Sequence, residues 1–113
     1  MSNSIFINEA FLTFKGSVVV ELKYSVKSSL IISDMIFLVL NIPSEHFENR
    51  NVVCYNMDGK LIWNIIAGEY PREYCPVTGI SEIDNQLVVY RRCGIEEVIN
   101  IESGVIISSE LIK

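Results

Sequence analysis

The sequence is poor in cysteine, histidine and basic residues, and each shortage excludes a class of protein. Its 113 residues include three cysteines and one histidine, and nine Lys plus Arg stand against fourteen Asp plus Glu, for a net charge of −5. Nonspecific nucleic-acid binding needs clustered Lys and Arg, so we expect no direct nucleic-acid partner. An acidic domain is better suited to a basic partner, although many acidic domains have no such partner.

The three cysteines also form no recognisable motif. Cys54, Cys75 and Cys93 are odd in number and widely spaced, with neither a CxxC pair nor a Cys/His pair at zinc spacing. This pattern predicts free thiols in a reducing cytosol and no metal site. Cys54 lies in an apolar run and is expected to be a small core residue.

No segment has the features of a targeting signal or a membrane span. The first four residues, MSNS, place no basic region before an apolar run, so we expect no signal peptide. The most apolar stretch, residues 30–42, contains Ser33, Asp34 and Asn41, and is too short and too polar to cross a bilayer. The sequence therefore predicts a cytoplasmic protein that does not bind membranes.

The hydrophobic half of the sequence is arranged in short strand-like runs. Val, Ile, Tyr and Phe dominate them, and turn residues interrupt them at short intervals. We predict one all-β domain over residues 1–113, mainly antiparallel hairpins, as a two-sheet sandwich or an incomplete propeller- or barrel-like fold. Residues 44–49 could form at most one helical turn, with Ser44 as N-cap. The expected strands are residues 4–7, 10–14, 17–24, 30–32, 35–42, 51–56, 60–66, 77–83, 87–91, 96–101 and 105–111.

Turn residues mark how these strands are joined. Gly16 marks one turn, and Asp58-Gly59 is the strongest short-range hairpin signal in the chain. Residues 84–86 join the next hairpin, and Ser103-Gly104 joins the last. Residues 35–42 have few polar breaks, which predicts a strand buried on both faces.

Two segments carry a family resemblance. VVCYNMDGKLIWNI at residues 52–65 is similar to the inner-strand hairpin of β-propeller blades in the quinoprotein and WD-like repeat families, and VINIESGVIISS at residues 98–109 looks like a degenerate copy. A propeller closes with about four or more blades, whereas this chain has material for about two. The resemblance implies a local antiparallel meander and no ligand site.

The residues needed for catalysis or cofactor binding are missing or otherwise explained. His46, the only histidine, lies in a loop, where a solvated side chain is the commoner role. Glu96 and Glu97 are adjacent, so in a strand they point to opposite faces and cannot act as paired acids. The glycines stand singly, so no phosphate-binding loop exists. We therefore expect no enzyme activity, no cofactor and no metal. The aspartates at 34, 58 and 84 fall where turns favour Asp.

The loop at residues 68–76, GEYPREYCP, is the main candidate for a binding surface, together with the polar loop PSEHFENR at residues 43–50. Tyr and Arg are enriched at interface hot spots. The alternative is that the two tyrosines cap the core edge and the arginine is solvated. Trp63 is expected in the core, and Tyr90-Arg91-Arg92 is too small a basic spot for nucleic acid. The candidate partner-binding residues are Glu45, Glu48, Glu69, Tyr70, Arg72, Glu73 and Tyr74.

The functional hypothesis rests on the general type of the protein and not on a sequence motif. A small, acidic, cysteine-poor chain without catalytic residues resembles the bacterial immunity proteins that neutralise toxins of contact-dependent growth inhibition. That resemblance implies tight binding to a cognate toxin, often a nuclease with a basic face. The alternative is a structural or accessory β domain that self-associates or completes a larger β assembly. An enzyme that uses His46 is the third and weakest hypothesis.

Overall fold

The computed structural model describes residues 5–14 and 18–112, and it confirms the all-β prediction. Within these ranges it has eleven strands and one 3-10 turn, and no helix there is long and apolar enough to cross a membrane. The elements are β1 (Ile5–Asn8), β2 (Phe11–Phe14), β3 (Val18–Glu21), β4 (Val26–Ile32), β5 (Met35–Leu40), η1 (Ser44–His46), β6 (Val52–Asn56), β7 (Leu61–Asn64), β8 (Val77–Ile83), β9 (Gln86–Arg91), β10 (Ile95–Ile99) and β11 (Ile106–Leu111).

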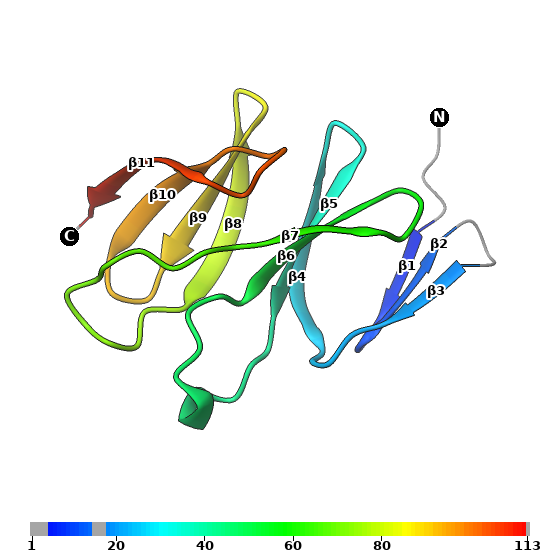
Figure 1. Cartoon of the computed structure of the whole chain (residues 1–113), viewed down its shortest axis with the longest axis horizontal. Helices are drawn as coiled ribbons and strands as arrows, with labels where there is room; N and C mark the ends of the chain where they lie inside the picture. Colours follow the sequence, from blue (N-terminus) through cyan, green and yellow to red (C-terminus); the bar gives the residue numbers. More distant parts are fainter. Residues whose placement is uncertain (1–4, 15–17, 113) are drawn as a thin grey trace.

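The strands form three antiparallel sheets that follow one another along the chain (Figure 1). Sheet A has the order β1-β2-β3, sheet B the order β4-β5-β6-β7, and sheet C the order β11-β10-β9-β8. Each sheet is a meander, because every strand pairs with its neighbour in the sequence. The meander that the sequence predicts is thus confirmed, and it is repeated in three sheets.

Sheet B is the centre of the molecule and is covered on both faces. One hydrophobic cluster joins it to sheet C and includes Phe37, Cys54 and Trp63. A second cluster joins it to sheet A and includes Ile36 and Val53. Successive residues of a strand point to opposite faces, so four consecutive residues of β5 are fully buried. This confirms the prediction that residues in 35–42 are buried on both faces.

Tight turns with left-handed backbone join several of the hairpins. Ser33 and Asp34 have φ of 50° and 63°, and Asp84 and Asn85 have φ of 53° and 62°. Two successive positive φ values are typical of the two-residue turn that matches strand twist, which Asn and Asp tolerate. The aspartates at these positions are therefore explained by turn geometry, as predicted. Gly59 has φ of 81°, and the Asp58-Gly59 turn joins β6 to β7 as predicted.

The last turn packs against the only tryptophan. Gly104 has φ of 77°, and a Cβ atom there would lie 2.6 Å from Cδ2 of Trp63. The indole N–H of Trp63 donates a hydrogen bond to the carbonyl of Ile101 at 2.8 Å. Glycine is therefore required both for the backbone and for the close approach of the ring. Trp63 is 8% exposed, which confirms its predicted place in the core.

The prediction of three free thiols is wrong for two of them. Cys75 and Cys93 form a disulfide with a Cα–Cα distance of 5.3 Å. Their separation in sequence concealed the pairing, but the register of β8 and β9 places Val77 opposite Arg91, which brings both cysteines to the same end of sheet C. Cys54 is free and fully buried, and burial raises the pKa of its thiol to about 12.

Some element boundaries also differ from the prediction. β4 begins at Val26, four residues before the expected start, because residues 26, 28 and 29 pair with the end of β5. The helical turn covers only Ser44–His46, and Pro43 precedes it, so Ser44 is not its N-cap. β10 ends at Ile99 because the side chain of Asn100 accepts the backbone N–H groups of the next turn. The predictions for residues 4, 16 and 17 lie outside the described residues.

Candidate functional site

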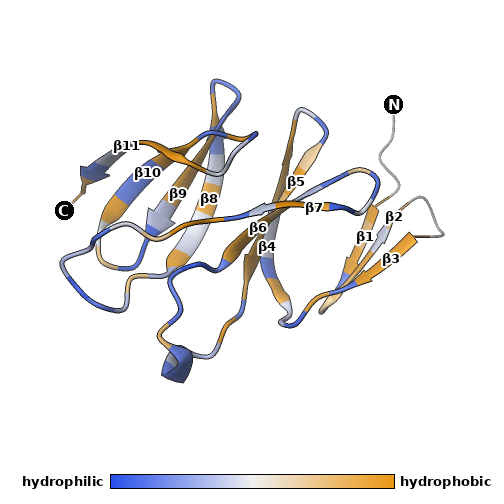
Figure 2. Cartoon of the chain, in the orientation of Figure 1, coloured by the Kyte–Doolittle hydropathy of each residue, from blue (hydrophilic) through white to orange (hydrophobic). Residues whose placement is uncertain are grey.

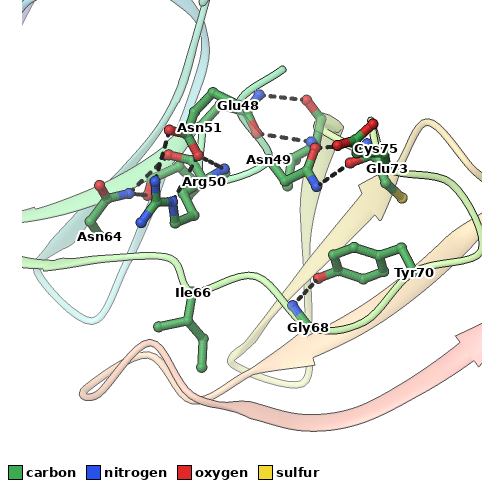
Figure 3. Close-up of polar contacts among 12 residues, drawn as sticks. Glu48, Asn49, Arg50, Asn51, Asn64, Ile66, Gly68, Tyr70, Glu73 and Cys75 are labelled. Atoms are coloured by element: carbon green, nitrogen blue, oxygen red, sulfur yellow. Dashed lines mark hydrogen bonds and ion pairs between the residues drawn. The ribbon is translucent and has the colours of Figure 1, made fainter. Parts of the chain in front are cut away.

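The two loops that carry the predicted binding residues lie side by side, and asparagine side chains join them (Figure 3). Asn49 donates to the carbonyl of Glu73 at 2.9 Å and accepts from the N–H of Cys75 at 2.7 Å. Asn51 repeats the pattern with the carbonyl and the N–H of Val77, at 2.8 and 2.9 Å. The two amides replace the backbone pairing that a further strand would supply, so the loop before β6 is fixed against the segment leading into β8.

A buried ion pair lies beneath this junction, on the inner face of sheet C. The guanidinium Nε of Arg91 on β9 is 2.7 Å from Oε1 of Glu97 on β10, and the two side chains are 0% and 1% exposed. Taking two charges out of water is costly, and the pair is stable only when its remaining hydrogen-bonding groups also find partners. Glu97 thus points inward and Glu96 outward, as the sequence predicted for adjacent strand residues.

The other donors of Arg91 hold three separate segments of the chain. One terminal nitrogen donates to the carbonyls of Asn49 and Cys75, both at 2.8 Å. The second lies 3.4 Å from the carbonyl of Ile66. A single guanidinium therefore connects sheet C to the loop before β6 and to both ends of the loop between β7 and β8. The disulfide of Cys75 fixes the same loop to the β9–β10 turn.

Tyr70 completes the buried network. Its hydroxyl donates to Oε2 of Glu97 at 2.7 Å and accepts the N–H of Gly68 at 2.9 Å. The guanidinium carbon of Arg91 lies 4.7 Å from the centre of its ring, within cation–π range. Burial raises the pKa of Tyr70, so the phenol stays protonated and keeps its role as donor. The structure thus gives Tyr70 the role of anchoring its loop at the core edge, which was the alternative reading of this residue.

A pair of aromatic rings lies on the outer side of the junction. The rings of Phe47 and Tyr74 are 5.7 Å apart and nearly perpendicular, and the guanidinium of Arg92 lies 5.7 Å from the centre of the Tyr74 ring. Phe47 is 62% exposed and has φ of 50°. A bulky residue in the left-handed region is strained, and such strain is concentrated at functional sites.

The charged side chains on the outer side of the two loops, with that of Arg92, divide into two groups. Glu48 forms an ion pair with Arg50 at 2.8 Å, and the hydrogen bond from Arg50 holds the pKa of Glu48 below its usual value. The charged side chains of the second group are exposed and make no ion pair with any described residue; they are Glu45, Glu69, Arg72, Glu73 and Arg92. We call the outer side chains the two-loop surface, comprising Glu45, Phe47, Glu69, Arg72, Glu73, Tyr74 and Arg92.

The sequence singled out these two loops as candidates, but it did not reveal the residues that position them. Arg91 was read as part of a basic spot, whereas it is buried, and Phe47 and Asn49 were not singled out. The available signals were the arginine that directly ends an apolar run, LVVYR, and two asparagines in the stretch ENRNVV. Polar residues beside buried strands usually have a fixed hydrogen-bond partner.

His46, the residue that the enzyme hypothesis uses, lies beside Tyr24. The imidazole of His46 lies 3.3 Å from the hydroxyl of Tyr24, with no carboxylate in that hydrogen bond. No group of three His, Cys, Asp or Glu side chains gathers as a metal site would require among residues 5–14 and 18–112.

The sequence matches a protein-family model over nearly its whole length. A model described as "Domain of unknown function (DUF7957)" matches residues 2–111. The chain belongs to this family. No curated protein matches it.

Replacing Glu97 by Gln should destabilise the protein strongly. The change leaves the Arg91 charge buried without a counterion, so we expect a loss of about 3–5 kcal/mol in the free energy of unfolding, measured by urea denaturation. Glu96→Gln, on the same strand but facing outward, is the matched control and should change it by less than about 0.5 kcal/mol. Equal effects of the two variants would contradict the role given to the buried pair.

Proposed function

We propose that this protein is a non-enzymatic binding module, and specifically an immunity protein that neutralises a cognate bacterial toxin by direct contact. The observation that carries the proposal is the two-loop surface. It presents exposed aromatic and charged side chains on loops that a disulfide, two asparagines and a buried ion pair hold in place. Loops held by a rigid scaffold are the usual carriers of binding function.

The aromatic pair would be the anchor of the interface. Phe47 is 62% exposed, the ring of Tyr74 packs against it edge to face, and Arg92 in turn lies against the Tyr74 ring. Aromatic residues and Arg dominate interface hot spots because they bury a large area. A preorganised loop also loses less conformational entropy on binding. These features favour a stable complex with one partner.

The charge of the molecule favours a basic partner. The net charge is −5, and Glu45, Glu69 and Glu73 are exposed on the two loops without an ion-pair partner among the described residues. Complementary charge speeds encounter and selects between partners. A nuclease, whose active-site face must attract phosphates, is the kind of toxin that fits, and the protein itself would contact no nucleic acid.

The proposed compartment is the cytoplasm, where such a toxin would act. Cytosolic thiol pools keep most cysteines reduced, so the Cys75–Cys93 bond would have to resist them there. Cys75 is fully buried and Cys93 is partly buried, so a cytosolic thiol would have to reach the sulfur of Cys93.

Phe47→Ala should weaken the complex with the toxin encoded by the neighbouring gene. Loss of a hot-spot aromatic costs about 2 kcal/mol or more, or roughly thirtyfold in affinity, measured by calorimetry. Phe6→Ala, which removes another exposed phenylalanine far from the two loops, is the matched control. Absence of any complex on gel filtration, together with absence of protection of cells from that toxin, would refute the proposal.

A second candidate function is self-association through the outer face of sheet A. Strand register places Phe6, Thr13 and Val19 in one row on this face, and Phe11 lies in a neighbouring row. Phe6 is 70% exposed and Val19 is 59% exposed, and β1 and β3 are largely hydrophobic in Figure 2. The opposite face of sheet A packs on sheet B. A second copy could cover this apolar face, as an accessory β domain would require.

Self-association predicts a dimer whose stability depends on Phe6. Sedimentation of the wild-type protein should show a concentration-dependent dimer, and Phe6→Asp should shift it to monomer because a charge would be buried in the interface. Phe47→Asp should leave the dimer unchanged. A strict monomer across the accessible concentration range would exclude this candidate.

A further inference from the structure

A polar cleft lies on the other side of the loop at residues 43–50, away from the aromatic pair. It is enclosed by the chain leaving β3, by that loop, and by β6 and β7, and its volume is about 450 Å³. Pockets for small molecules are commonly about 300–1,000 Å³. The cleft is therefore large enough for a small organic molecule, and neither the two-loop surface nor the face of sheet A uses it.

The wall of the cleft has an apolar part and one unusual polar group. Leu22 and Val53 are each 8% exposed and line the cleft. Tyr55 lies beside them, is 9% exposed, and its hydroxyl forms no hydrogen bond with any described residue. Burial also raises the pKa of Tyr55. Among the described residues only Ser28 has a fully buried side-chain polar atom without a partner, so the Tyr55 hydroxyl is open to the cleft, where a polar group of a ligand would hydrogen-bond to it.

The charges that line the cleft balance. Glu48 and Arg50 neutralise one another through two side-chain hydrogen bonds of 2.8 and 3.0 Å. Glu21 and Lys23 also line the cleft, are exposed, and form no ion pair with a described residue. One carboxylate and one ammonium group are thus left for a ligand, in a chain whose net charge is −5.

The side chain of Asn64 adds a free acceptor. Its amide nitrogen donates to the carbonyls of Arg50 and Val52, at 3.1 and 2.8 Å. These bonds fix the orientation of the amide, while its oxygen accepts no hydrogen bond from a described residue. The lining therefore provides one free charge of each sign, a hydroxyl, a carbonyl oxygen and an apolar area.

We propose that this cleft binds a small zwitterion, namely a free α-amino acid with an apolar side chain. Glu21 would receive the ammonium group and Lys23 the carboxylate, while the apolar side chain would contact Leu22 and Val53. Tyr55 would hydrogen-bond the ligand at the wall of the cleft. A simple anion or a simple cation fits less well, because each would leave one charged side chain of the cleft without an opposite charge on the ligand.

The test is calorimetric titration of the full-length protein with leucine, methionine and phenylalanine. At least one should bind at millimolar concentration or below, and the analogues isoamylamine and isocaproate (4-methylpentanoate), which each lack one charged group of leucine, should bind at least about tenfold more weakly. No binding by any of the three amino acids, or equal binding by a singly charged analogue, would overturn the proposal.

Two variants locate the binding site. Tyr55→Phe should weaken binding about fivefold, because it removes one hydrogen bond and keeps the ring. Its matched control is Tyr90→Phe on the outer face of sheet C, where the hydroxyl bonds Ser81. Glu21→Gln is exposed and should weaken binding even if Tyr55→Phe disturbs folding, and its control is Glu96→Gln. Binding that is unchanged in Tyr55→Phe and Glu21→Gln would place the ligand elsewhere and overturn the proposal.

Discussion

The ion pair between Arg91 and Glu97 is the interaction on which the arrangement of the loops depends. The pair is fully buried, so the free-energy cost of removing its charges from water is large unless every donor and acceptor of the pair has a hydrogen-bond partner. The structure meets this condition with backbone carbonyls from residues 49, 66 and 75 and with the hydroxyl of Tyr70. The partners that make the pair tolerable are thus drawn from the two loops. The same hydrogen bonds therefore satisfy the buried charges and hold the two loops in place.

The sequence was informative wherever structure depends on neighbouring residues. Alternation of apolar residues predicted most strands, Asp58-Gly59 predicted its hairpin, and the apolar run of β5 predicted burial on both faces. It failed where partners are distant in sequence. Cys75 and Cys93 meet because of the register between β8 and β9, and no local pattern encodes that register. Arg91 ends an apolar run, which indicates a fixed hydrogen-bond partner but does not identify that partner. Its burial follows from the stacking of the sheets, which periodicity alone does not specify.

The candidate site, like the fold, could be predicted from the sequence only in part. The loops at residues 43–50 and 68–76 could be recognised from their composition, because Tyr, Arg and Glu are concentrated between apolar strands. Which side of each loop faces outward could not be recognised. Tyr70 and Tyr74 are four residues apart in one loop, yet Tyr70 anchors the core edge and Tyr74 supports the exposed ring of Phe47. The loop at residues 43–50 also separates two surfaces of different character, the aromatic pair on one side and the charge-balanced cleft on the other.

The buried pair keeps the two loops in one fixed arrangement, and amide hydrogen exchange can measure how firmly each loop is held. The double variant Arg91→Met/Glu97→Leu removes both charges together, and such apolar replacements can preserve global stability. The account predicts that the amides of Gly68 and Cys75 lose most of their protection in this variant, while the amide of Phe37 in the central sheet keeps its own. Unchanged protection of Gly68 and Cys75 would contradict the account.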